Sequence, residues 1–197
     1  MSKRRGRPPK YDAAEALKGA LQVFWRKGLT ATSLDDLAES MEMNRPSIYN
    51  AFGDKVSIYR KAFTQFANQL GDELDTILDE SCTLKEAMSR FYERALTTYL
   101  DNEELLGCFV TCTAPVESVA HPEIRRDLAT LIAEIDSRLK CRLERAQENG
   151  DWPSSRDTKT TAKLLHATLQ SLAIRARSGE DRESLVDFYS STVELLC

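Results

Sequence analysis

The pattern of hydrophobic and polar positions predicts a chain built almost entirely of helices. Apolar residues recur three and four positions apart through most of the 197 residues, which is the spacing of one face of an α-helix. No stretch alternates apolar and polar residues as a half-buried strand would, so we expect an all-α fold without a sheet. Capping and turn residues divide the pattern into predicted helices at about 13–27, 34–41, 45–52, 55–79, 84–99, 105–110, 122–148, 158–176 and 184–196.

Two of these helices, 34–41 and 45–52, are short and separated by a tight turn. Ser33 and Asp36 form a capping-box-like start for the first, and Asn44 caps the second. Ile48 and Phe52 give the second helix an inward face. The side chains left outward are Arg45, Pro46, Ser47, Tyr49 and Asn50. Together with the helix before them, these two helices have the pattern of a helix-turn-helix unit whose last helix can enter a DNA major groove.

The motif resembles the TetR/AcrR family of transcriptional regulators, most clearly over residues 12–63. The residues that carry the resemblance are Thr32, Ser33, Ile48, Tyr49, Phe52, Lys55 and Tyr59. The resemblance implies phosphate contacts for Ser33, Tyr49 and Lys55. It implies that Asn44, Arg45, Pro46, Ser47 and Asn50 face the groove of a double-stranded DNA operator. Family members often have glycine in place of Pro46, and an aromatic residue or histidine in place of Asn50 or Ala51, so the operator sequence stays open.

The charge is distributed unevenly along the chain. Residues 1–60 carry an excess of four positive charges and the remainder an excess of eight negative charges. The first ten residues, MSKRRGRPPK, are too polar to bury a core, so we expect a disordered arm over residues 1–11. Arg4, Arg5 and Arg7 flank one glycine, as in segments that insert into a narrow A·T minor groove. The alternative is a basic tail that binds any DNA by releasing counterions.

The rest of the chain divides into a helix-turn-helix domain at residues 12–53 and a helical domain at residues 54–197. The family resemblance implies that the second domain binds a small-molecule effector and pairs with a second copy through its last two helices, giving a homodimer. Aromatic and polar residues on the inward stripes of this domain are candidates for the effector pocket. These residues are Phe66, Phe91, Tyr99, Phe109, Cys112 and His166. Core packing is the alternative explanation for each of them.

Cys108 and Cys112 are two thiols four residues apart and are candidates for chemical modification. One helical turn apart, their Cβ atoms are too distant for an undistorted disulfide. A single thiolate could still sense an oxidant or electrophile, although Glu103, Glu104 and Glu117 disfavour a depressed pKa. Two cysteines supply half of a tetrahedral metal site, so we expect no metal.

The sequence therefore predicts a ligand-responsive, dimeric DNA-binding regulator, and in particular a repressor that a small molecule releases from a palindromic operator. One alternative is a constitutive or architectural DNA-binding protein whose helical domain only dimerises. Another is a repressor that senses oxidants through a thiol. No catalytic constellation, phosphate loop or cofactor motif is present, so we expect neither an enzyme nor a bound cofactor. Five cysteines without a paired pattern predict the cytoplasm, and no apolar stretch is long enough to predict a membrane span.

Overall fold

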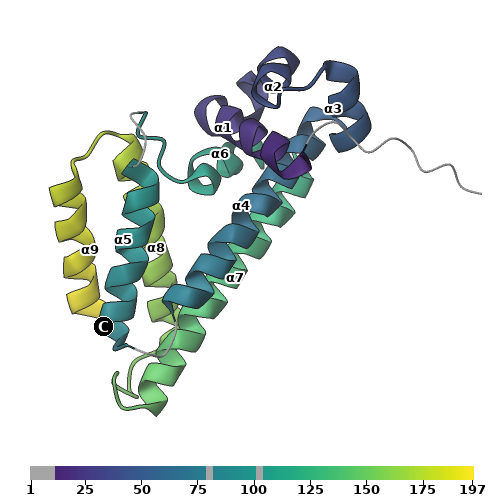
Figure 1. The fold of residues 1–197 in the computed structure, drawn as a ribbon. Helices are drawn as coiled ribbons and strands as arrows, with labels where there is room; N and C mark the ends of the chain where they lie inside the picture. Colours follow the sequence, from purple (N-terminus) through teal and green to yellow (C-terminus); the bar gives the residue numbers. More distant parts are fainter. Residues whose placement is uncertain (1–11, 79–81, 101–103) are drawn as a thin grey trace, which may run out of the picture. The chain divides into compact units, whose positions relative to one another are not determined.

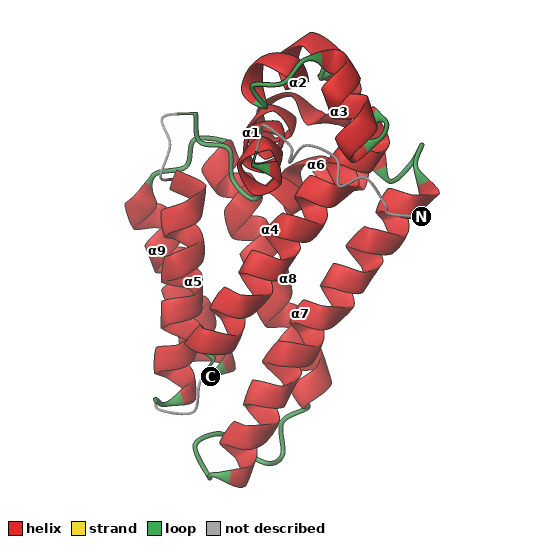
Figure 2. Ribbon diagram, turned by 45° about the vertical axis from the view of Figure 1, so that its right-hand side comes forward, coloured by secondary structure: helices red, strands yellow, loops and turns green. Residues whose placement is uncertain are grey.

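The computed structural model describes residues 12–78, 82–100 and 104–197, and in these ranges it contains helices and no strand (Figure 1, Figure 2). The all-α prediction is therefore confirmed. The helices are α1 (Ala13–Ala31), α2 (Leu34–Ser40), α3 (Arg45–Phe52), α4 (Lys55–Ile77), α5 (Leu84–Leu100), α6 (Phe109–Glu117), α7 (Pro122–Glu148), α8 (Thr158–Arg177) and α9 (Arg182–Leu196).

Short polar side chains begin most of these helices. Each helix leaves its first backbone N–H groups without an internal partner, and a side-chain oxygen can accept from one of them. At α2, the Ser33 hydroxyl accepts from the N–H of Asp36, whose carboxylate accepts from the N–H of Ser33. The predicted capping box is therefore confirmed. The other helices whose N-cap side chain accepts in this way are α1, α3, α4, α5, α8 and α9, capped by Asp12, Asn44, Asp54, Thr83, Asp157 and Asp181.

The chain forms two compact units that divide inside α4, between Gln65 and Phe66. We call residues 12–65 the N-terminal unit and the described residues from 66 onward the C-terminal unit. The sequence had placed a domain boundary before α4, at residue 54. The difference arises because Ile58, Tyr59 and Ala62 of α4 are almost fully buried, with the Tyr59 ring packed edge-on against Phe24 at 5.2 Å.

The core of the N-terminal unit is tightly packed between α1 and α2. Phe24, Leu37 and Ile48 have no exposed surface. Gly19 of α1 lies directly against the end of α2, where a Cβ atom would approach the Ser40 carbonyl oxygen to 2.0 Å. Only glycine permits this approach, because any other side chain would have to push two helix backbones apart.

In the C-terminal unit, α8 packs against α5, α6, α7 and α9. The helices α5, α8 and α9 pack against one another, and Figure 1 shows them side by side. The Tyr92 hydroxyl of α5 donates to the Leu165 carbonyl of α8 at 2.9 Å, so this buried polar group is satisfied. Trp152 Nε1 similarly donates to the Leu196 carbonyl at 2.9 Å and ties the loop before α8 to the end of α9.

One helix prediction was wrong. Residues 105–110 were expected to be helical and broken near Pro115, but α6 begins at Phe109 and contains Pro115. The segment before α6 turns instead, with a positive φ of 65° at Gly107. Gly107 lies so close to α8 that a Cβ atom would reach the Ala173 carbonyl oxygen at 2.3 Å. This contact forms only when the segment packs against α8, which lies far along the chain, so local sequence does not reveal it. Asp79, the expected end of α4, lies outside the described residues.

Candidate nucleic-acid interface and internal cavity

The outer face of α3 carries the side chains that were predicted to face a DNA groove. Asn44, Arg45, Pro46, Tyr49 and Asn50 are exposed and Ser47 is half-buried. Tyr49 keeps 47% of its surface exposed, unusually much for a large aromatic residue. Ile48 and Phe52 point into the core and hold this face outward. The fold thus presents polar and aromatic groups together on one short helix, as a major-groove reader requires.

Two of these groups already have partners within the chain. The Asn44 Oδ1 accepts from the Ser47 N–H at 2.9 Å and so caps α3. The Arg45 guanidinium pairs with Asp35 of α2, with 2.9 Å between Nε and Oδ1. Both partners of this ion pair are largely exposed, so it contributes little stability and can open when a stronger anion approaches.

Two of the predicted phosphate contacts, Ser33 and Lys55, lie at the starts of helices. The hydroxyl of Ser33 caps α2, and the ammonium of Lys55 donates to the carbonyls of Thr32 at 2.8 Å and Thr30 at 3.3 Å. Lys55 therefore ties the end of α1 to the start of α4, whatever else it contacts. Its role toward phosphate, and the roles of Ser33 and Tyr49, remain predictions. Arg4, Arg5 and Arg7 lie outside the described residues.

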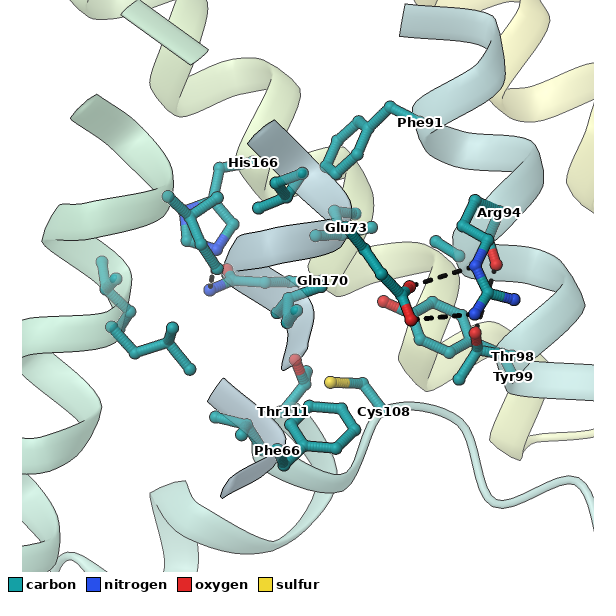
Figure 3. Close-up of a pocket in the computed structure, with 18 of the residues that line it drawn as sticks. Phe66, Glu73, Phe91, Arg94, Thr98, Tyr99, Cys108, Thr111, His166 and Gln170 are labelled. Carbon is teal, nitrogen blue, oxygen red and sulfur yellow. Dashed lines mark hydrogen bonds and ion pairs between the residues drawn. The ribbon is translucent and has the colours of Figure 1, made fainter. Parts of the chain in front are cut away.

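The C-terminal unit contains a cavity of about 320 Å³ whose wall is formed by α4, α5, α6, α7, α8 and the segment before α6. This volume lies within the range of small-molecule sites. Of the residues predicted for a pocket, Phe66, Phe91, Tyr99 and His166 line the cavity (Figure 3). The lining is mainly apolar, with contributions from Leu74, Leu131, Ile135 and Leu169 among others.

Two residues predicted for the pocket do not line it. Phe109 is fully buried and packs edge-on against Phe66, with ring centroids 5.7 Å apart, so it supports the wall from behind. The Sγ of Cys112 lies 4.0 Å from the Ala173 carbonyl oxygen. Helical spacing could not separate these two from the lining residues, because it marks an inward side chain without showing which neighbour that side chain faces.

Cys108, the other predicted thiol, does line the cavity (Figure 3). Burial raises the pKa of its thiol, and hydrogen bonds from the N–H and hydroxyl of Thr111 oppose that rise only in part. The Tyr99 hydroxyl lies beside it, and burial raises the pKa of that hydroxyl well above its ordinary value. The thiol is thus neutral at physiological pH, which lowers its reactivity. All five cysteines are free.

The charged and amide groups of the cavity wall were not predicted from the sequence. Glu73 of α4 accepts two hydrogen bonds from Arg94 of α5, and Gln69 donates to the same carboxylate at 3.1 Å. On the opposite side, Gln170 lies 3.4 Å from His166, whose Nδ1 is 2.7 Å from Asp136. Gln69 and Glu73 follow Phe66 at helical spacing, and that spacing was the available signal.

Within the described ranges, no group of three or more histidine, cysteine or acidic side chains is arranged to hold a metal ion. The helices of those ranges include none that is both long and apolar enough to cross a membrane.

Comparison with known sequences decides the family. The profile described as bacterial regulatory proteins, tetR family, matches residues 16–62, and the profile described as Tetracyclin repressor-like, C-terminal domain, matches residues 85–191. The chain belongs to the TetR family. It is a transcriptional regulator of that family, as the resemblance in the sequence predicted.

TetR-family relatives match over nearly the whole chain. The HTH-type transcriptional repressor ComR of Escherichia coli (strain K12) is 26% identical, over 99% of this chain and 93% of its own length. The uncharacterized HTH-type transcriptional regulator YezE of Bacillus subtilis (strain 168) is 24% identical, over 97% of this chain and 99% of its own. A cysteine mutant of the TetR family regulator CifR, solved with 26bp double-strand operator DNA, is 28% identical. It has a TM-score of 0.86 and covers 95% of this chain and 98% of its own.

Proposed function

We propose that this TetR-family regulator is a homodimeric repressor that binds a palindromic operator and is released from it by a small, largely apolar molecule. The observation that carries the proposal is the presence, in one chain, of an outward polar face on α3 and an apolar cavity of about 320 Å³ in the C-terminal unit. The CifR structure with operator DNA and the naming of ComR as a repressor support it.

DNA binding is assigned to the outer face of α3. Arg45 offers a planar fork of donors that matches the two acceptors of a guanine edge, and Asn50 can pair with adenine. Asn44 and Ser47 lie at the start of the same helix and face the same groove, while the phosphate contacts are assigned to Ser33, Tyr49 and Lys55. One such helix spans only a few base pairs, so two copies are needed for a specific site.

Dimerisation is assigned to α8 and α9. Leu164 and Ile174 keep 48% and 58% of their surface exposed on α8, and Leu195 of α9 keeps 72%. Leu164, Ala167, Ser171 and Ile174 recur at helical spacing and form a mainly apolar stripe along α8, exposed except at the half-buried Ser171. Such a stripe is self-complementary about a twofold axis, which is the symmetry that a palindromic operator requires.

The switch is assigned to α4, because this continuous helix belongs to both units. Tyr59 is buried in the core of the N-terminal unit, while Phe66, Glu73 and Leu74 line the cavity. A ligand that prefers one position of α4 shifts the population of DNA-binding dimers by its difference in affinity, typically about 1–3 kcal/mol.

The two alternatives receive less support. An architectural protein needs no internal cavity, yet the C-terminal unit has one at the aromatic residues expected to form it. A thiol sensor needs a reactive thiolate, whereas burial raises the pKa of Cys108. A regulator that binds operator DNA also has no need of enzymatic activity, and five free cysteines fit the reducing cytoplasm.

The proposal is tested by selecting bound sequences from random double-stranded DNA with the full-length protein. We expect enrichment of a palindrome whose half-sites lie one helical turn, or a multiple of it, apart. Recovery of DNA without a shared sequence would refute the operator-binding proposal and favour the architectural alternative.

A further inference from the structure

Glu73 and Arg94 form an ion pair in the cavity wall, and its geometry is that of a matched fork. Arg94 Nε lies 3.0 Å from Glu73 Oε2, and Arg94 Nη2 lies 2.9 Å from Glu73 Oε1. Figure 3 shows the carboxylate and the guanidinium facing each other across the space between α4 and α5. Two parallel bonds of this kind hold both partners in register.

The carboxylate of this pair is fully ionised at neutral pH. Burial raises the pKa of Glu73, but hydrogen bonds from Arg94 and Gln69 outweigh that effect and hold the pKa below its ordinary value. The Arg94 guanidinium stays protonated at any physiological pH. One negative and one positive charge therefore cancel at this point of the wall.

The remaining polar groups of the described wall add no unmatched charge. His166 faces the Asp136 carboxylate through Nδ1 at 2.7 Å, and its other nitrogen faces the Gln170 amide. Thr98 and Thr111 contribute hydroxyl groups. Arg94 keeps 46% and Glu73 keeps 29% of its side-chain surface exposed. An anionic ligand would compete with Glu73 for Arg94, and a cationic ligand would compete with Arg94 for Glu73. Removing a charge from water without a partner is costly, so either ligand is disfavoured.

We propose that the cavity selects neutral ligands with an apolar ring system and one amide-like or hydroxyl-like group, and that Glu73 sets this selectivity by occupying Arg94. This inference rests on the proposed function, since it assumes that the cavity is the effector site. Of the two uncharged amides on the wall, Gln69 donates to Glu73, while Gln170 offers a donor and an acceptor to the ligand's polar group.

The experiment compares two probes of the same shape, 2-naphthamide and 2-naphthoate, by isothermal titration calorimetry on the full-length protein without DNA. The wild type is expected to bind the amide at least about 10-fold more tightly than the carboxylate. Glu73→Gln keeps the size of the side chain and frees Arg94, so the carboxylate should bind about 10-fold more tightly than it binds the wild type.

A matched control lies on the same helix. Asp75 accepts from Arg138 at 2.9 Å, which is the same kind of bond, but Asp75 does not line the cavity. Asp75→Asn should therefore leave the ratio of the two affinities unchanged. If Glu73→Gln does not fold, the double variant Glu73→Gln/Arg94→Gln provides a second test, because it removes both charges and should retain the preference for the amide.

Several results would overturn the inference. These are a wild type that prefers the carboxylate, equal affinities for the two probes, no binding of either probe, or a Glu73→Gln variant with the wild-type ratio. A parallel titration with operator DNA separates this inference from the proposed function. Amide binding that leaves operator affinity unchanged would refute the effector role, while the charge selectivity would stand.

Discussion

The two units of this chain carry their candidate functional groups in opposite places. In the N-terminal unit the candidate DNA-binding groups lie on the outside of α3. Ile48 and Phe52 are the buried residues of that helix, and the other side chains face away from the core. In the C-terminal unit they lie on the inside, where Phe91 and Tyr99 are as buried as any core residue. The helical pattern of α3 places Tyr49 outward, where an aromatic residue is unusual. The pattern of α5 places Phe91 inward, where an aromatic residue is expected whether or not a cavity is present. A binding surface is thus easier to recognise than a cavity.

The units also differ in how much free space they contain. The α1–α2 contact has none at Gly19, where a single added methyl group would meet the Ser40 carbonyl oxygen. The C-terminal unit surrounds about 320 Å³ of space. We infer that the N-terminal unit must hold α3 in a fixed position, while the C-terminal unit must leave room for an occupant.

The largest expected effect tests this difference in packing. Gly19→Ala should destabilise the N-terminal unit by about 1–3 kcal/mol or more, because the methyl group forces two backbones apart. Ala95→Leu adds three carbons but points them toward the cavity, so it should cost much less. The chain has one tryptophan in each unit, Trp25 and Trp152. Urea unfolding followed by Trp25 fluorescence in a Trp152→Phe background measures the loss from Gly19→Ala, and Trp152 fluorescence in a Trp25→Phe background measures the loss from Ala95→Leu. Equal losses from the two substitutions would contradict the comparison.

The next effect concerns the outer face of α3. Arg45→Ala should lower specific DNA binding by about 1–3 kcal/mol and relax base preference at one position in each half-site. Lys55→Ala should instead weaken binding to all sequences and reduce the salt dependence by about one unit of slope. Fluorescence anisotropy with the selected operator and its single-base variants measures both. An unchanged profile for Arg45→Ala would assign Arg45 to phosphate contacts.

Asp35→Asn changes the other partner of the Arg45 ion pair and leaves Arg45 in place. This substitution removes the partner of Arg45 and one negative charge near the proposed DNA face, so affinity should rise for every sequence. Weaker binding would show that the ion pair positions Arg45 for the operator.

A smaller effect is expected from the N-terminal arm. Deleting residues 1–10 should reduce affinity by about 10-fold for operators flanked by A·T pairs, and by less for G·C flanks, because a narrow minor groove attracts arginine. Replacing Arg5 and Arg7 with lysine should give a partial version of the same loss. Equal losses on both flanks would indicate a tail that acts through charge alone.

The smallest effect tests whether the inward thiol is shielded. Because burial raises the pKa of Cys108, iodoacetamide should modify it slowly at neutral pH and faster only as the pH approaches that raised pKa. Exposed Cys141 should be modified about 10-fold sooner at neutral pH. Mass spectrometry of the labelled peptides measures both rates. Preferential modification of Cys108 at neutral pH would favour the thiol-sensing alternative.

Much of the fold could be predicted from the sequence because its signals are local. Ser33 with Asp36, and Asn44 with Ser47, fix helix starts through bonds three residues apart, and the predicted range 122–148 matches α7. The irregular segment at Gly107 could not be predicted, because its cause is the Ala173 carbonyl on a distant helix.

The candidate sites likewise could be predicted where their residues are close in sequence, and not where they depend on contacts between distant helices. The outer face of α3 was predicted from helical spacing within eight residues. The pairing of Glu73 with Arg94 depends on how two helices pack, and either residue in isolation reads as an ordinary solvated charge. Phe109 and Cys112 were assigned to the pocket because they were predicted to point inward. An inward side chain can also face a neighbouring helix, as these two do, and not the cavity.

We propose that a ligand in the cavity and operator DNA on α3 affect each other's affinity. Measuring each affinity in the presence and absence of the other partner tests this coupling. The affinity of 2-naphthamide is measured by calorimetry on the full-length protein alone and on its complex with the selected operator. We expect the operator to weaken 2-naphthamide binding about 5- to 150-fold. We expect the amide to weaken operator binding by the same factor, because coupling between two sites is reciprocal. Equal affinity of the amide for the free and DNA-bound protein would contradict the account.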